Sequence, residues 1–457
     1  MRLSRQNHWH VFGWFVLAFT FSTLVLMELS YERGLWMLTS YGAPLTFAFF
    51  GASLARGHWK GGMWLGPVFL AWFVLSRVLL GEHYLEESQT NFFLLCTAYL
   101  TALPFAGAVD RDGRRKGLLL TCALTAFITS VLAWIGVAAA LSGERFTLPV
   151  LGSSFYLTGG RLWAFDRHPN MAACIWLLGL FAVAYLALTI RKKWFIPLAL
   201  VLALGLWIGI SFTVSRTVML LCGSAAAIAA FLLLRRSRLK PGWLRVAVAV
   251  LAALLAAVLV YKGFTWTASA ASRLSAGAEA ETAQTVAEPT RAPLQIGVRP
   301  LENDLKTMTG RTRVFEGFFD LVRHRPKVLA LGVLNKNLTI ELNRYIPHDT
   351  LAVFHHAHNS YIQVTLNLGL PGLALALWFT WLALRSGVRI LLLSPGSRTS
   401  AAEKLIPIIC LTLLISTISE VYLFTDQFPM CNFWFFLCLG YALQIEKRLK
   451  AESVAKA

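Results

Sequence analysis

Residues 170–213 read NMAACIWLLGLFAVAYLALTIRKKWFIPLALVLALGLWIGISFT. Two apolar runs of about 20 residues flank the cationic triplet Arg191, Lys192 and Lys193, and each run is long enough to cross a bilayer as a helix. Over the 457 residues of the chain, 57% are hydrophobic and only 14% are charged, whereas soluble domains are about a quarter charged. The sequence therefore predicts an all-α polytopic membrane protein.

The rest of the chain repeats this pattern, and about twelve apolar runs have the length of a spanning helix. They lie at residues 11–28, 35–55, 62–80, 91–109, 117–141, 170–190, 194–213, 217–234, 246–263, 360–384, 404–424 and 430–445. Connections rich in Lys and Arg alternate with poorer ones, and more than half of the 42 Lys and Arg residues lie on one face. The positive-inside rule makes that face cytoplasmic, so both termini are expected in the cytoplasm.

These runs divide the chain into three parts. Residues 1–263 are expected to hold nine spanning helices, 264–358 one large periplasmic loop, and 359–457 three more helices and a cytoplasmic tail. We expect 264–310 to be mobile, because this segment is rich in Ala, Glu, Thr and Pro. Apolar residues at helical spacing predict an amphipathic helix over 311–331, either on the membrane surface or packed over the bundle.

Four polar clusters lie on the non-cytoplasmic face, where helices are expected to begin. They are residues 160–170, with Arg161, Arg167, His168 and Asn170; Ser215-Arg216-Thr217; Gly310-Arg311-Thr312-Arg313; and His355-His356-Ala357-His358-Asn359. Pro169 suits a first helical turn, and Ser215 is a candidate N-cap. A helix N-terminus offers backbone N–H groups, and an arginine there adds a bidentate donor for phosphate. Together the clusters predict a site that holds a diphosphate without a metal ion.

The arginines also have a simpler interpretation, since arginine at a membrane interface commonly extends to lipid headgroups. We assign that role to Arg313, Arg323 and Arg325. Ligand binding is favoured for Arg216, which sits in a very short turn, and for Arg311, which follows Gly310.

His358 is the candidate general base, because a neutral imidazole can accept a proton from an alcohol. His355, His356 and His358 could also form a metal site, but no carboxylate or cysteine stands beside them in the sequence, so we expect no metal. The role of His356 stays open between positioning and loop structure.

Other classes of function have less support. Arg77 and Glu420 are the ionisable residues nearest to the membrane interior, and both lie toward the ends of their runs. Ion-coupled transporters generally need such groups near the midplane, so the sequence disfavours transport. We find no P-loop, dinucleotide fingerprint or nucleophile elbow, which leaves nucleotide use and serine hydrolysis without support.

The clusters resemble those of the O-antigen ligase and polymerase superfamily of bacterial polysaccharide assembly. The resemblance rests on His168-Pro169-Asn170, Ser215-Arg216-Thr217, Gly310-Arg311, and His358-Asn359 followed by Gly369 and Pro371-Gly372-Leu373. The spacing of the last group resembles the most characteristic signature of the family. The likeness covers roughly residues 150–380, and the helix count with one large loop resembles the lipopolysaccharide O-antigen ligases most.

The resemblance implies a fold related to the GT-C glycosyltransferases, in the bacterial inner membrane, with a periplasmic active site. It implies an inverting glycosyltransferase without metal, nucleotide or other cofactor, which moves a glycan from undecaprenyl diphosphate to a hydroxyl of lipid A-core. His358 would be the catalytic base, and the donor diphosphate would bind Arg216, Arg311 and one or both of Arg161 and Arg167. Supporting roles would fall to Asn359, His168, Asn170, Ser215 and His356.

Membrane lipids are expected partners of such a protein, and nucleic acid is not. An O-antigen polymerase or a pilin-type O-oligosaccharyltransferase would carry similar motifs, and a transporter of lipid-linked sugars remains a further alternative.

Overall fold

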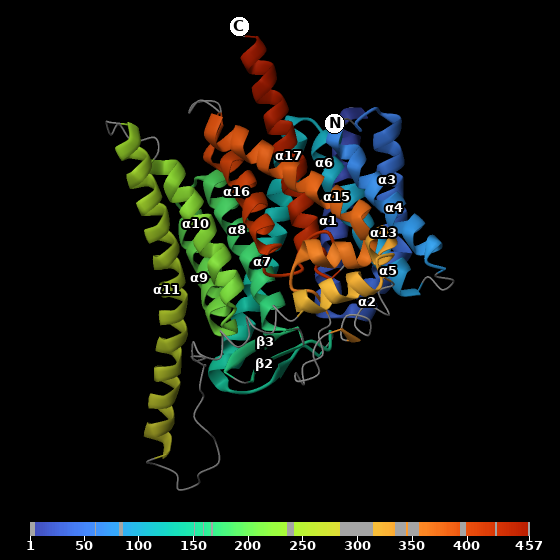
Figure 1. The fold of residues 1–457 in the computed structure, drawn as a ribbon. Coiled ribbons are helices and arrows are strands. Elements are labelled where there is room, and N and C mark those ends of the chain that lie inside the picture. Colours follow the sequence, from blue (N-terminus) through green and yellow to red (C-terminus); the bar gives the residue numbers. More distant parts are fainter. Residues whose placement is uncertain are drawn as a thin grey trace. The chain divides into compact units, whose positions relative to one another are not determined.

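The computed structural model describes residues 5–59, 61–81, 86–149, 151–158, 160–165, 168–234, 242–283, 314–333, 344–345, 356–393, 399–425 and 427–455. The chain divides into two compact units, which Figure 1 draws in the colours of the sequence. Unit 1 comprises residues 1–27, 31–118 and 300–457, and unit 2 comprises residues 28–30 and 119–299.

Within its described residues, unit 1 consists of helices joined by turns, with no strand. Its elements are α1 (Arg5–Leu29, whose last two residues belong to unit 2), α2 (Tyr31–Met37), the π-helical turn η1 (Leu38–Gly42), α3 (Ala43–Ala55), the short 3-10 helix η2 (Gly61–Trp64), α4 (Leu65–Leu79), α5 (Glu86–Cys96), the π-helical turn η3 (Thr97–Ala102), α6 (Leu103–Ala108), the start of α7 (Arg111–Ser142), a helix at 314–324, α13 (Val328–Leu331), α15 (Ser360–Val388), η4 (Arg389–Leu393), α16 (Ala401–Ser416) and α17 (Pro429–Val454).

Unit 2 holds the rest of α7, a small sheet and four long helices. Its elements are β1 (Phe146–Thr147), β2 (Ser154–Thr158), β3 (Arg161–Ala164), α8 (Pro169–Ile190), α9 (Phe195–Thr213), α10 (Arg216–Leu234) and α11 (Gly242–Ala283). Trp207 of α9 stacks on Phe264 of α11 with ring centroids 3.8 Å apart, which joins these two helices.

Among the described residues, nine helices are long and apolar enough to cross a membrane, and they coincide with nine of the predicted runs. The structure thus confirms a mostly helical polytopic membrane protein, while the total of twelve spans stays a prediction. The run at 35–55 is helical but contains the π turn η1. The run expected over 404–424 is shorter, because α16 ends at Ser416.

The prediction of an all-α fold is wrong between α7 and α8, where β1, β2 and β3 form an antiparallel sheet. Tyr156 pairs with Trp163 and Thr158 with Arg161, so two residues connect β2 to β3. Gly160 in this turn has φ +69°, a conformation that glycine adopts without steric cost. Aromatic and aliphatic residues alternating between the two faces favour strands here over a helix.

The ninth predicted span also ends later than expected. We placed its end at residue 263, whereas α11 continues through Ala283, so residues 264–283 are helical and not part of a loop. This stretch is rich in alanine, the strongest helix former, and its helix propagates from the preceding span.

Helix α15 is interrupted at Gly369, which has φ +68° and ψ −168°, and Pro371 follows. The break leaves backbone carbonyls of the preceding turn without partners inside the helix. Trp72 Nε1 of α4 donates to Leu368 O at 2.8 Å, and Arg77 of α4 donates to Asn367 O.

The segment after α13 packs directly against this break. Arg77 Nη1 also donates to Val333 O at 2.9 Å, and Val333 N donates to Leu366 O at 2.6 Å. Arg77 is 2% exposed, so its cationic group is buried among the carbonyls it binds. These bonds satisfy the carbonyls that the break exposes, which is the condition for irregular backbone inside a membrane protein.

Candidate active site

His358 lies two residues before the start of α15. Asn359 is the N-cap of this helix, and its Oδ1 accepts hydrogen bonds from Tyr361 N at 3.0 Å and Ile362 N at 3.1 Å. His358 itself has φ +50°, in the left-handed region. The sharp turn and the cap together present the imidazole beside the N-terminus of the helix.

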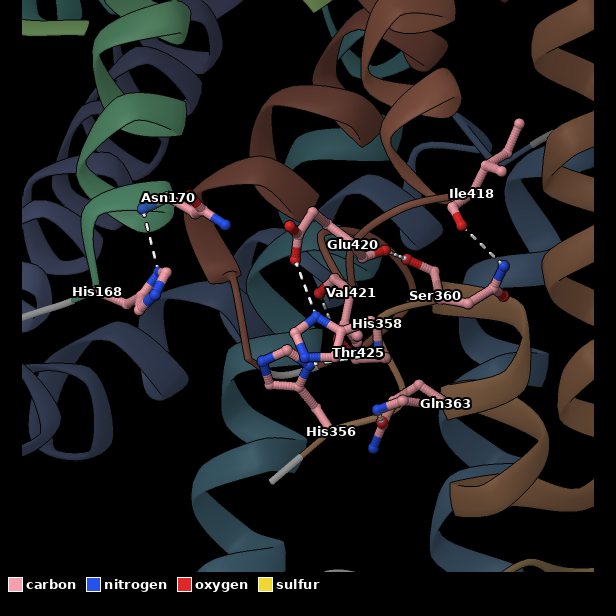
Figure 2. Close-up of polar contacts among 12 residues, drawn as sticks. His168, Asn170, His356, His358, Ser360, Gln363, Ile418, Glu420, Val421 and Thr425 are labelled. Atoms are coloured by element: carbon pink, nitrogen blue, oxygen red, sulfur yellow. Dashed lines mark hydrogen bonds and ion pairs between the residues drawn. The ribbon is translucent and has the colours of Figure 1, made fainter. Parts of the chain in front are cut away.

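The imidazole faces a buried carboxylate. His358 Nδ1 lies 3.6 Å from Glu420 Oε2, as Figure 2 shows, and the side chains are 26% and 3% exposed respectively. This separation is slightly longer than a hydrogen bond, a common state for catalytic pairs before substrate binds. A carboxylate on Nδ1 favours the tautomer with the proton there, which leaves Nε2 as a proton acceptor.

Glu420 is held in place by backbone contacts with the start of α15. Ser360 N donates to Thr417 O at 2.9 Å, Ser360 Oγ donates to Glu420 O at 3.0 Å, and Asn359 Nδ2 donates to Ile418 O at 3.1 Å. The segment after α16 is therefore pinned to the helix that follows His358. The carbonyls of 417, 418 and 420 thus accept hydrogen bonds from residues 359–360, while the N–H groups of 417–420 still donate to carbonyls of 414–416 in α16.

The residues before His358 are also ordered by α15. Gln363 Oε1 accepts a hydrogen bond from Ala357 N at 2.8 Å, and the rings of His356 and His358 lie 4.1 Å apart between centroids. His356 Nδ1 is 3.4 Å from the backbone N of His358 and accepts from it. His356 thus contacts His358 directly and can position it.

The helix at 314–324 packs against the residue next to His358. Val314, Phe318 and Leu321 share one buried cluster with Ala357 and Leu366. Of the two predicted alternatives for this amphipathic helix, the burial supports packing over other helices. The apolar face is narrower than we expected, because Phe319 is 65% exposed.

In unit 2, Arg161 joins three elements. From β3, its Nε donates to Thr213 O at the end of α9 at 2.9 Å, and its Nη2 donates to Asn170 Oδ1 on α8 at 3.0 Å. His168 is the N-cap of α8, and its Nδ1 accepts from Asn170 N at 3.3 Å. Pro169 occupies the first turn, as we predicted. The guanidinium of Arg161 is thereby held at the start of α8.

Arg216 is the first residue of α10, after a turn in which Val214 has φ +51°. Ser215 stands at the N-cap position, where its carbonyl accepts from Met219 N at 3.0 Å, but the expected side-chain cap is not formed, because its Oγ is buried and has no hydrogen-bond partner within the described chain. The left-handed turn at Val214 buries the Ser215 side chain instead of placing it over the helix. The position of Arg216 at the N-terminus of α10 agrees with our prediction.

Strained backbone concentrates around these clusters. Among the described residues, five that are not glycine have positive φ: Phe165, Arg191, Val214, His358 and Phe424. His358 is itself a candidate residue, and Val214 lies two residues before Arg216. Phe165 lies three residues before His168, Phe424 four residues after Glu420, and Arg191 ends α8. Such strain persists where the surroundings hold a residue in place, and it is often found at functional sites.

The candidate residues do not all come from one unit. His356, His358 and Glu420 belong to unit 1, while Arg161, His168, Asn170 and Arg216 belong to unit 2. Arg167, Arg311 and His355 lie outside the described residues. Within the part of the chain that is described, no group of three or more His, Cys, Asp or Glu residues is placed to hold a metal ion.

One part of the chain, which contains several of the candidate residues, matches a known protein family. Residues 198–377 match the family model described as O-antigen ligase, a segment that contains Arg216, His358, Asn359 and the break at Gly369. The match covers 180 of the 457 residues and supports the resemblance to the O-antigen ligase superfamily. No curated protein and no solved structure matches the chain. Members of this family are glycosyltransferase-like enzymes, and the family implies lipid-linked polysaccharide as the general class of substrate.

Glu420 lies beyond the segment that matches the superfamily, and our sequence analysis gave it no role in the site. We noted it only as an ionisable residue near a predicted span. The available signal was an acidic residue in an otherwise apolar run, which in a membrane protein generally has a buried partner. The sequence does not identify the partner of Glu420, because His358 is far away along the chain and only the fold brings the two residues together.

Proposed function

We propose that this chain is an O-antigen ligase with a GT-C-related fold in the bacterial inner membrane. It would transfer a glycan from undecaprenyl diphosphate to a hydroxyl of lipid A-core at the periplasmic face, without metal or nucleotide. The single observation that carries the proposal is the His358–Glu420 pair at the start of α15, 3.6 Å apart, with His358 inside the segment that matches the superfamily.

In this mechanism, His358 Nε2 takes the proton of the acceptor hydroxyl as its oxygen attacks the anomeric carbon of the donor. The new carbon–oxygen bond forms while the bond between that carbon and the diphosphate oxygen breaks. Attack opposite the leaving group inverts the anomeric configuration. Glu420 stays ionised, orients the ring through Nδ1 and stabilises the imidazolium that forms.

Arginines would neutralise the charge that develops on the departing undecaprenyl diphosphate. We assign this role to Arg216, Arg311 and one of Arg161 and Arg167. The assignment of Arg311 rests on its place after Gly310 in the sequence, since it lies outside the described residues. For Arg161, the bonds to Thr213 and Asn170 support a rigid guanidinium near the start of α10.

A deletion strain of the source bacterium tests the proposal. Loss of all long glycan from lipid A-core, with accumulation of lipid-linked polymer, is expected from loss of a ligase. Single repeat units attached to the core would instead identify a polymerase, and unglycosylated pilin with normal lipopolysaccharide would identify an O-oligosaccharyltransferase.

Complementation links the phenotype to the site. The wild-type gene should restore glycan attachment, and His358→Ala, produced at equal abundance in the membrane, should not. Restoration by the variant would contradict the role of His358 in every glycosyltransferase version of the proposal. Reconstituted vesicles that translocate lipid-linked sugar without transferring it would identify a transporter.

A further inference from the structure

The outer face of the small sheet in unit 2 carries two aromatic side chains that the proposed chemistry does not use. Tyr156 on β2 and Trp163 on β3 are cross-strand partners, and their rings lie 6.1 Å apart with only 13° between their planes. Both side chains are partly exposed. We call Tyr156 and Trp163 together the aromatic face.

The opposite face of the sheet explains why this pair points away from the helices. Phe155, Leu162 and Ala164 alternate with the pair along the strands and are fully buried. Phe155 and Leu162 close around Gly136 of α7, and β3 contacts α8 and α9. Within unit 2 the sheet lies across the ends of these helices, so its outer face looks away from them (Figure 1).

Polar groups flank the two stacked rings. The Arg145 guanidinium lies over the Tyr156 ring, 4.9 Å from its centre, and Arg145 Nη2 donates to Ser154 Oγ at 3.0 Å. The exposed ring of His168 meets Trp163 at 5.6 Å, with 69° between the planes. Parallel rings with a guanidinium and an imidazole beside them offer both apolar surface and hydrogen-bonding groups, which suits a sugar with its apolar C–H face and polar hydroxyls.

The position of Arg161 indicates that a sugar bound at the aromatic face would belong to the donor. Arg161 lies two residues before Trp163 on β3, and its guanidinium turns toward the helices, where it donates to Thr213 O at the end of α9 and to Asn170 Oδ1 on α8. The aromatic face is therefore adjacent to an arginine that we assign to the donor diphosphate. In the donor, the first sugar of the glycan is bonded directly to that diphosphate.

We infer that Tyr156 and Trp163 form a carbohydrate-binding face for the glycan of the lipid-linked donor. The inference rests on the proposed glycosyl transfer and adds a binding site to it. The main competing role is an aromatic anchor at the membrane interface, where Trp and Tyr are common. The guanidinium over Tyr156 and the imidazole beside Trp163 supply hydrogen-bonding groups that favour a glycan over lipid tails.

The test uses the purified full-length protein in detergent, with the free glycan released from the lipid-linked donor by mild acid as the probe. Calorimetry should show that Trp163→Ala and Tyr156→Ala each weaken glycan binding about tenfold. Trp163→Phe keeps an aromatic ring and should retain most of the affinity. The matched control is Trp266→Ala on α11, which removes a tryptophan that is 74% exposed and should change nothing.

Transfer assays then assign the glycan. The two alanine variants should raise the KM for the lipid-linked donor about as much as they weaken glycan binding, with kcat and the KM for the acceptor unchanged. Wild-type affinity for the glycan in both variants, confirmed as folded by thermal unfolding, would overturn the inference and indicate a membrane anchor. A rise confined to the acceptor KM would also overturn it.

The two proposals fail separately. His358→Ala should bind the free glycan as tightly as the wild type although its transfer rate is lower by about 10² to 10⁴-fold. If the wild type itself shows no transfer while glycan binding still depends on Trp163, the enzyme proposal fails and the binding face stands.

Discussion

His358 and Glu420 meet across the first turn of α15, with Nδ1 of the ring 3.6 Å from a carboxylate that is 3% exposed. The backbone around both residues is fixed by the same bonds, which run from Asn359 and Ser360 to the 417–420 segment. The buried carboxylate of Glu420 needs a cationic or hydrogen-bonding partner, which His358 provides. The base His358 needs a fixed tautomer, which the carboxylate of Glu420 provides. The predictions below begin with this pair.

Glu420→Gln should lower kcat for glycan transfer by about 10- to 100-fold and leave the KM for donor and acceptor nearly unchanged. The amide keeps the shape of the carboxylate but loses the charge that stabilises the imidazolium. Steady-state kinetics on the purified variant check this split. A pure stability effect would instead reduce the amount of folded protein and leave kcat per folded molecule as in the wild type.

Arg216→Lys should reduce transfer by at least about tenfold, because a point ammonium cannot reproduce the bidentate fork of a guanidinium on a diphosphate. Arg245→Lys is the control, since Arg245 lies in α11 outside the proposed site. Transfer rates at saturating acceptor measure the effect. Wild-type kinetics in Arg216→Lys would remove Arg216 from the proposed diphosphate site.

Gly332→Ala should destabilise unit 1. Gly332 has φ +84°, and a Cβ there would lie 2.3 Å from backbone atoms of Asn367, at the break of α15. Gly81→Ala is the matched control, because Gly81 has φ +73° but open space around it. The control should cost about 1–2 kcal/mol for the left-handed backbone.

Gly332→Ala adds overpacking of about 1–3 kcal/mol to that backbone cost. Thermal unfolding of both variants in the same detergent compares them. Equal shifts in Tm would show that the contact between Gly332 and the broken helix contributes nothing to stability.

Glu446→Gln should flatten the acid dependence of stability. Burial raises the pKa of the Glu446 carboxyl, but hydrogen bonds from Arg389, Ser386 and Lys450 outweigh burial and hold it below the ordinary value of 4.5. A lowered pKa stabilises the fold above the unfolded-state value, and this stabilisation is lost as pH falls through the folded-state value.

The wild type should therefore lose stability below about pH 4.5, and Glu446→Gln should lose less over the same range. At neutral pH the variant should be less stable by about 1–3 kcal/mol, because Arg389 is 40% exposed and water screens part of the loss. Thermal unfolding of both proteins at a series of pH values from about 3 to about 7 measures both effects. If Tm fell with pH in the same way for the two proteins, Glu446 would be ruled out as the source of the acid dependence of stability.

Local signals predicted much of the fold. Run length and composition located the nine helices that are able to span, and Pro169 marked the first turn of α8. The end of α16 escaped prediction, because the carbonyls of 417, 418 and 420 bond to residues 359–360, and hydropathy carries no information on such distant partners. The sheet escaped because its strands are short, with five residues in β2 and four in β3.

The candidate site divides in the same way. His358 and Arg216 could be proposed from sequence, because each stands at the start of a helix that begins where we expected. The prediction of a side-chain cap for Ser215 failed on a left-handed turn at Val214 that β-branched residues rarely adopt. Glu420 and the aromatic face escaped prediction because cross-strand and tertiary pairings bring their partners together.

The most direct test of the central claim is a transfer assay with purified protein, lipid-linked donor and core acceptor, with EDTA present and no nucleotide. The wild type should attach glycan to the core, and His358→Ala should be slower by about 10² to 10⁴-fold while binding donor normally. Transfer by His358→Ala at the wild-type rate would contradict the role of His358 as the base.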